Sequence, residues 1–122
     1  HGHAVGDQVL RGVADALRGC IRSTDTLARM GGEEFMLLMP MTDSDSALTQ
    51  ARRLCEKIGT TALPTAAGPL HITMSLGVAE VLPTDTQANA VVVRADAALY
   101  RAKASGRNRV EVAQKRVLPG GD

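Results

Sequence analysis

Two adjacent glycines between two short apolar runs restrict the fold of this chain more than any other feature. Gly31 and Gly32 separate residues 26–30, which favour an extended chain, from the apolar run 35–39, which Pro40 ends. Glycine adopts the positive backbone angles that a tight turn needs, so this pattern predicts a β-hairpin with the glycines at its tip.

Three stretches of the sequence place apolar residues at the three-to-four spacing of an amphipathic helix. They cover residues 7–20, 47–58 and 88–102, and we expect a helix over each of them. Alternation of apolar and polar residues over residues 71–78 predicts a strand, and a short last strand is expected over residues 109–113. This order of elements is typical of an α+β domain with an antiparallel-rich central sheet flanked by helices.

The chain has the length and charge of one folded domain without a strong electrostatic field. It has 122 residues, and its 14 Lys and Arg against 13 Asp and Glu give a formal charge of +1. Such a charge does not attract nucleic acid or an anionic membrane, so any phosphate site has to be local. Aromatic residues make up only 2% of the chain, which leaves no platform for stacked bases, and nucleic acid is not an expected partner.

Neither a membrane span nor a disulfide is expected within this sequence. The longest apolar run, residues 35–39, is far shorter than the roughly 20 residues that cross a bilayer. Cys20 and Cys55 lack the spacing of a metal site and lie in helix-like patterns, which favours buried thiols and a reducing compartment. We therefore expect a cytoplasmic location, in a parent protein that is either untethered or attached to a membrane.

Charged residues at the glycine turn and near the end of the third helix each allow two interpretations. Glu33 and Glu34 offer the oxygen ligands that Mg²⁺ prefers, beside a backbone that a metal-bound triphosphate can approach, or they are solvated side chains of a tight turn. Lys103 and Arg107 lie four residues apart, so they either bind one phosphate chain together or compensate the dipole at the helix end.

Two further sets of charged residues also allow two interpretations each. Asp7 either caps the first helix or accepts hydrogen bonds from the N1 and N2 donors of guanine. Arg22 lies three residues before Asp25, a spacing that gives either a surface ion pair or a clamp for a phosphorylated purine ligand.

Taken together, these motifs resemble those of the GGDEF diguanylate cyclases in order and in spacing. The matching segments are GHAVGD (2–7), RSTD (22–25), RMGGEEF (29–35), TMSLGVA (73–79), RADAALYRAK (94–103) and SGRNRV (105–110). They cover nearly all of the chain, with GGEEF in place of GGDEF. The resemblance implies an α+β palm of the nucleotide cyclase, ferredoxin-like type.

The activity that the resemblance implies is the synthesis of cyclic di-GMP from two molecules of GTP, with release of pyrophosphate. Mg²⁺ or Mn²⁺ is the implied cofactor, bound by the catalytic acids Glu33 and Glu34. The implied substrate contacts are Asp7 for guanine, Gly31 and Gly32 beside the nucleotide, and Lys103 and Arg107 for the terminal phosphates.

The resemblance also implies regulation and partners. Arg22 and Asp25 match the RxxD site at which the product inhibits the enzyme, and Arg53 is a candidate for a secondary product contact. Each domain is expected to hold one GTP, so two GGDEF domains have to face each other as a homodimer. A sensory or regulatory domain upstream is a further expected partner.

One departure from the family pattern bears on activity. The family has, before the GHAVGD segment, a strand with a metal-binding Asp and a guanine-binding Asn, and this sequence begins after them. We therefore expect residues 1–114 to form an N-terminally incomplete GGDEF domain with little or no activity, followed by a flexible tail, residues 115–122. The alternative is a catalytically inactive regulatory domain that binds cyclic di-GMP or GTP.

Overall fold

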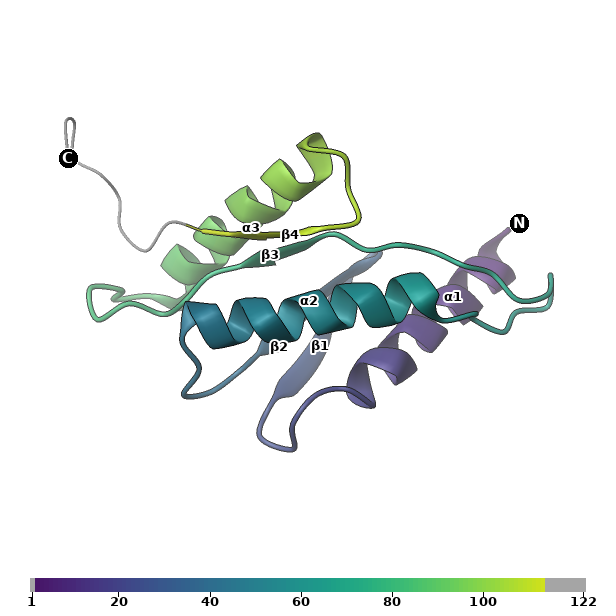
Figure 1. The fold of residues 1–122 in the computed structure, drawn as a ribbon, viewed down its shortest axis with the longest axis horizontal. Helices are drawn as coiled ribbons and strands as arrows, with labels where there is room; N and C mark the ends of the chain where they lie inside the picture. The colour runs from purple at the N-terminus through teal and green to yellow at the C-terminus, as the bar shows by residue number, and fades with distance from the viewer. Residues whose placement is uncertain (1, 114–122) are drawn as a thin grey trace. The chain divides into compact units, whose positions relative to one another are not determined.

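The computed structural model describes residues 2–113 of the chain, so the predicted tail lies outside the described residues. Over this range the elements follow in the order α1, β1, β2, α2, β3, α3, β4 (Figure 1). The predicted α+β class is confirmed. Within residues 2–113, none of the helices combines the length and the apolar character that crossing a bilayer requires.

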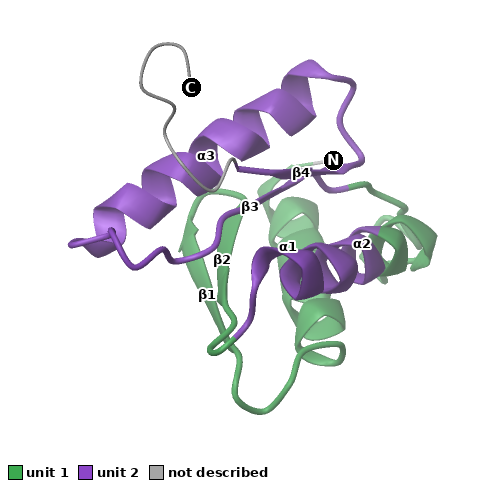
Figure 2. Cartoon of the chain, turned by 60° about the vertical axis from the view of Figure 1, so that its left-hand side comes forward, with its two compact units in different colours: residues 1–41, 56–73 green, residues 42–55, 74–122 purple. Residues whose placement is uncertain are grey.

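The residue contacts divide the chain into two compact units (Figure 2). Unit 1 contains residues 1–41 and 56–73, and unit 2 contains residues 42–55 together with the chain from residue 74 onward. The helix α2, Ser44–Thr60, contributes its first residues to unit 2 and its last residues to unit 1.

The first helix of unit 1 begins earlier than the sequence predicts. The helix α1 spans His3–Arg18, with Gly2 before its first turn and Gly19 after its last. The expectation that Asp7 caps this helix is wrong, because Asp7 lies inside it. Val5 explains the earlier start, since it is 8% exposed and extends the buried stripe of Val13 and Leu17 toward the N-terminus.

A close contact fixes α1 against the segment that follows α2. A Cβ atom at Gly12 would lie 3.2 Å from Cδ2 of Leu63, so a larger residue there would crowd a leucine that is 1% exposed. Leu63 is held in turn by a pair of backbone hydrogen bonds with Leu70, of 2.8 and 2.9 Å. The Oε1 atom of Gln8 accepts a hydrogen bond of 2.7 Å from the backbone N–H of Ala66. The loop 61–69 is thus tied to the helix.

The hairpin of unit 1 confirms the prediction from the glycine pair. The strands β1, Thr26–Gly31, and β2, Glu34–Leu38, pair antiparallel in a register that places Thr26 opposite Leu38. The register shifts between Arg29 and Gly31, so the end of β1 carries an irregularity directly before the turn.

In unit 2 a helix packs closely on a parallel strand pair. The strands β3, Leu76–Val78, and β4, Val110–Val112, are parallel and are covered by α3, Ala88–Ala104. Gly77 permits this packing, because a Cβ atom there would overlap the carbonyl oxygen of Ala95 and the backbone nitrogen of Leu99.

The strand predicted over residues 71–78 is shorter in the structure. Only its last three residues are a strand, since Leu76 to Val78 pair with β4, whereas residues 71–75 are assigned to no strand. Alternation of apolar residues indicates which face of a chain is buried, but a strand also requires a partner backbone.

Candidate active site

The glycine turn exposes both its backbone and its acidic side chains. Gly31 and Gly32 have φ angles of 125° and 53°, in the region that glycine enters without steric cost. A Cβ atom built on either glycine would meet no other atom within 4 Å, so a large ligand has room beside this backbone. Glu33 and Glu34 are both exposed. The turn therefore presents two carboxylates next to open main chain.

Arg29, for which the sequence alone predicts no role, holds this turn in place. The Nε and Nη2 atoms of Arg29 donate hydrogen bonds of 3.0 and 2.7 Å to the carbonyl oxygen of Gly32. Two donors on one carbonyl restrict how the peptide after Gly32 can rotate. The only signal in the sequence is an arginine two residues before the glycine pair, and this spacing alone does not reveal the contact.

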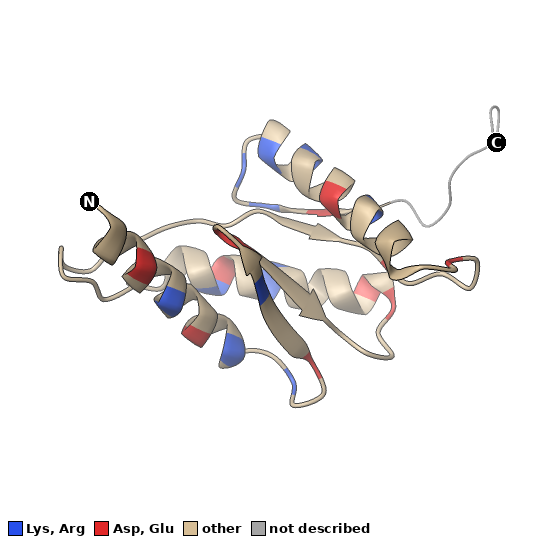
Figure 3. Ribbon diagram, turned by 180° about the vertical axis from the view of Figure 1, so that it is seen from behind, with Lys and Arg blue, Asp and Glu red and all other residues tan. Residues whose placement is uncertain are grey.

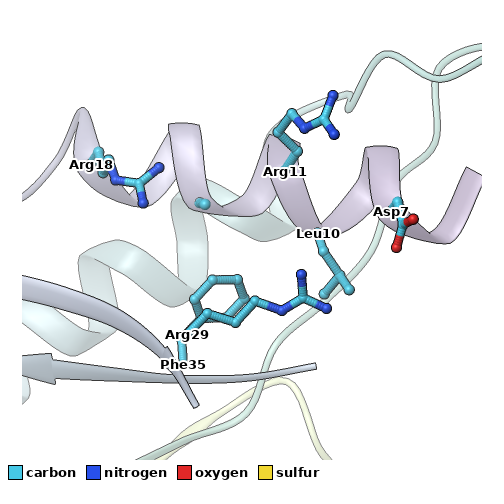
Figure 4. Close-up of a pocket in the computed structure, with 7 residues that line it drawn as sticks. Asp7, Leu10, Arg11, Arg18, Arg29 and Phe35 are labelled. Carbon is cyan, nitrogen blue, oxygen red and sulfur yellow. The ribbon is translucent and has the colours of Figure 1, made fainter. Parts of the chain in front are cut away.

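Asp7 lies beside the hairpin at an open pocket of about 360 Å³ (Figure 4). The lining residues from α1 are Asp7, Leu10, Arg11, Ala14 and Arg18, and those from the hairpin are Arg29 and Phe35. In Figure 4 the side chain of Leu10 points from the helix toward Arg29 and Phe35. Apolar and charged side chains both line the pocket, and ligand sites use such a mixture to bury a ligand and to orient it.

Arg22 and Asp25 form an ion pair, as one of the two interpretations of their spacing predicts. Arg22 donates to Asp25 from its backbone N–H at 3.0 Å and from Nη2 at 3.0 Å, and Nε lies 3.4 Å from Oδ2. The Asp25 side chain is fully buried, whereas 55% of the Arg22 side chain is exposed. Burial raises the pKa of the Asp25 carboxyl, but the hydrogen bonds from Arg22 outweigh it, and the pKa lies below its ordinary value.

The predicted phosphate contacts lie at the C-terminal end of α3 in unit 2. Lys103 is in the last turn of the helix and Arg107 follows it, and both are exposed. Basic residues gather at this helix end and in the loop after it (Figure 3). Arg53, the candidate for a secondary product contact, is exposed on α2.

The predicted residues therefore fall into two sets, one in each unit. The set in unit 1 consists of Asp7, Arg22, Asp25, Gly31, Gly32, Glu33 and Glu34, and the set in unit 2 of Arg53, Lys103 and Arg107. That Lys103 and Arg107 bind the same GTP as Asp7 and the glycine turn stays a prediction. So does the prediction that Arg53 binds the same product as Arg22 and Asp25.

The donor set at the glycine turn suits a metal that is shared with a ligand. Among residues 2–113 no group of three or more His, Cys, Asp or Glu side chains forms a metal site. Mg²⁺ typically keeps several waters and takes one or two carboxylates together with phosphate oxygens of a nucleotide. Glu33 and Glu34 match that donor set, since both are exposed at the end of the hairpin.

Comparison with known proteins gives a consistent family. The model of the diguanylate cyclase GGDEF domain matches residues 1–109. Diguanylate cyclase A of Treponema denticola is 37% identical over 93% of this chain and 31% of its own length. Diguanylate cyclase DgcP of Pseudomonas aeruginosa is 42% identical over 92% of this chain and 16% of its own length. The chain thus spans about a third or less of these two relatives.

Solved structures agree with the sequence comparison. The active GGEEF domain of a diguanylate cyclase from Vibrio cholerae has a TM-score of 0.85 at 29% identity, over 94% of this chain and 72% of its own. The GGDEF domain of DgcB from Caulobacter crescentus, in complex with c-di-GMP, has a TM-score of 0.83 at 35% identity. The match covers 91% of this chain and 66% of that domain's chain.

Proposed function

Because the chain belongs to the GGDEF family of diguanylate cyclase domains, we propose that the protein carrying it joins two molecules of GTP into cyclic di-GMP and releases two pyrophosphates. The observation that carries this proposal is the exposed glycine turn with its two carboxylates, within a segment that matches the family over residues 1–109.

Substrate binding is assigned to groups that match the chemistry of GTP. The carboxylate of Asp7 accepts hydrogen bonds from the N1 and N2 donors of guanine at the edge of the pocket. Gly31 and Gly32 let the phosphate chain approach the main chain, because no side chain occupies the space beside them. Lys103 and Arg107 bind the terminal phosphates and neutralise the charge that develops on the leaving pyrophosphate.

Glu33 and Glu34 are the proposed ligands of Mg²⁺ or Mn²⁺. When bound, such an ion lowers the pKa of a hydroxyl group and offsets negative charge on phosphate oxygens. The reaction needs both effects, since a ribose 3′-oxygen attacks the α-phosphate and displaces pyrophosphate. Glu33 and Glu34 would hold the ion at the hairpin, beside the open backbone of Gly31 and Gly32.

The proposed function also includes inhibition by the product and pairing of two domains. Arg22 presents an exposed guanidinium that the buried carboxylate of Asp25 orients, which suits it to bind a phosphate or the edge of guanine. Arg53 adds a second cation for the product. Cyclic di-GMP contains two guanylate units, so two such domains, each with one GTP, have to meet across a two-fold axis.

Replacement of one acid in the turn tests the assignment of the reaction. In the full-length protein, Glu33→Ala is expected to lower formation of cyclic di-GMP at least about 100-fold, because a metal ligand is lost. The free energy of unfolding should change by less than about 0.5 kcal/mol, since Glu33 is exposed. Glu56→Ala, an exposed glutamate of α2, is the matched control and should retain full activity.

Unchanged product formation by Glu33→Ala would remove Glu33 from the reaction. If the full-length protein forms no product from GTP but still binds cyclic di-GMP through Arg22, the protein is a receptor for this nucleotide. The preformed ion pair of Arg22 with Asp25 is the observation that favours this second function. The activity of residues 1–122 alone, which we propose to be low, is measured in the same assay.

A further inference from the structure

The loop after α3 carries three successive residues with positive φ angles. The values are 123° at Gly106, 64° at Arg107 and 48° at Asn108. For glycine this conformation has no steric cost, and asparagine tolerates it better than most residues. For a long side chain such as arginine it is unusual, and it persists only where neighbouring groups hold it.

Contacts on both sides of Arg107 hold its backbone. Its N–H donates a hydrogen bond of 2.9 Å to the carbonyl oxygen of Ala102, which is the closing bond of a helix C-cap. Its own carbonyl oxygen accepts a hydrogen bond of 3.1 Å from Nε of Arg109. The guanidinium of Arg109 also covers Gly106, because a Cβ atom at Gly106 would lie 2.8 Å from Nη2.

Asn108 connects this loop to the buried surface of α2. Its Oδ1 atom lies 3.6 Å from the Sγ atom of Cys55, which also lies 3.5 Å from the carbonyl oxygen of Met74. Cys55 is 8% exposed, and burial raises the pKa of its thiol, so the thiol keeps the proton that it donates. The bond is long and weak, but the buried cysteine gives the asparagine a defined place.

We propose that Asn108 is a positioning residue: through its contact with Cys55 it keeps the loop of residues 106–108 in its left-handed conformation, and so fixes the stretch of backbone from which the Arg107 side chain extends. The proposal rests on the proposed function, in which Arg107 binds the terminal phosphates of GTP. It goes further by naming the residue that prepares this contact before the nucleotide binds. A prepared arginine loses less conformational freedom when it binds.

Binding of two nucleotides that differ in phosphate number tests this role. The probes are 3′-deoxy-GTP, which lacks the attacking hydroxyl, and GMP, which lacks the terminal phosphates. For the full-length protein, we expect Asn108→Ala to weaken 3′-deoxy-GTP binding about three- to tenfold in calorimetry and to leave GMP binding unchanged. Asn108→Gly is the matched variant, because glycine keeps the left-handed conformation without the side-chain amide. It should lose less affinity for 3′-deoxy-GTP than Asn108→Ala does.

Arg107→Ala, measured in parallel, separates this proposal from the one on which it rests. Equal 3′-deoxy-GTP affinity for Arg107→Ala and the wild type would remove Arg107 from phosphate binding, and the positioning role of Asn108 would fall with it. If Arg107→Ala weakens 3′-deoxy-GTP binding and Asn108→Ala does not, only the positioning role is wrong. The same conclusion follows if Asn108→Ala weakens both nucleotides equally and lowers the melting temperature, because that pattern indicates a general loss of folding.

Discussion

Two ion pairs of this molecule use the same two residue types and leave the arginine in opposite situations. In the pair of Arg22 with Asp25 the aspartate side chain is fully buried and the arginine is 55% exposed. In the pair of Arg94 with Asp85 the two side chains are 17% and 7% exposed. Arg94 also donates to the carbonyl oxygen of Glu80 at 2.8 Å. One pair orients a cation toward solvent, and the other fastens a loop to α3.

This difference in exposure indicates which pair stabilises the fold and which pair can contact a ligand. In unit 2, Arg94 of α3 binds both Asp85 and the carbonyl oxygen of Glu80. Asp85 in turn accepts a hydrogen bond of 2.7 Å from the backbone N–H of Leu82. Such a network stabilises the fold and offers little surface to a ligand. Arg22 is paired with Asp25 within a short turn, and more than half of its side chain stays exposed.

The largest effect on folding is expected at Arg94. Arg94→Ala leaves the Asp85 carboxylate with little surface exposed and without its cation, which typically costs about 3 kcal/mol of unfolding free energy. Arg22→Ala should cost less, about 1 kcal/mol, because 55% of the Arg22 side chain is exposed and water can take its place beside Asp25, whereas only 17% of the Arg94 side chain is exposed. Urea denaturation of both variants measures the difference, and equal losses would contradict the distinction between the two pairs.

The next effect concerns the product. Arg22→Ala is expected to weaken binding of cyclic di-GMP at least about tenfold, because a charge-assisted contact to the ligand is lost. Turnover of GTP at low product concentration should stay unchanged, and only the inhibition should weaken. Loss of turnover together with loss of folding would instead assign Arg22 a purely structural role.

A smaller effect is expected at the second cation for the product. Arg53→Ala should weaken cyclic di-GMP binding a few-fold, which corresponds to about 0.5 to 1 kcal/mol. Arg52→Ala is the matched control, since Arg52 is the exposed neighbour of Arg53 on α2. Equal losses for the two variants would indicate a general effect of charge rather than a contact.

The last prediction concerns the dependence of stability on pH. Hydrogen bonds from the Arg94 side chain and the Leu82 backbone, with the charge of Arg94, lower the pKa of Asp85 from 3.8 to about 2. A lowered pKa stabilises the fold above the ordinary value, and this stabilisation is lost as the pH falls through about 2. Asp85→Asn should therefore flatten the loss of unfolding free energy between pH 4 and pH 2, approximately the interval between those two values. An unchanged slope would contradict the contribution of Asp85.

The sequence predicts those parts of the molecule that depend on local chemistry. The glycine pair predicted the hairpin, and helical spacing predicted all three helices to within a few residues at most ends. The start of α1 was missed, because Asp7 suits the N-terminal end of a helix and the single apolar residue Val5 before it does not by itself indicate a further turn. The length of the strand predicted over residues 71–78 was overestimated, because the apolar alternation contains no information on which residues find a partner strand.

Contacts between distant residues were not predictable in the same way. Arg94 and Asp85 are nine residues apart, and no regular spacing on one helix joins them. Asn108 and Cys55 are 53 residues apart in the sequence, and they meet because the first part of α2, up to Cys55, packs in the same unit as the loop after α3. Gly77 reads as an ordinary strand glycine until the backbone of α3 is seen against it. Such contacts depend on packing between elements, which the pattern of one segment does not contain.

The most direct test of the account is the stoichiometry of the reaction that the full-length protein catalyses. With GTP and Mg²⁺ we expect one cyclic di-GMP and two pyrophosphates for every two GTP consumed, and we expect Glu33→Ala to abolish both products together. Pyrophosphate without cyclic di-GMP, or no consumption of GTP by the full-length protein, would contradict the proposed role of the glycine turn.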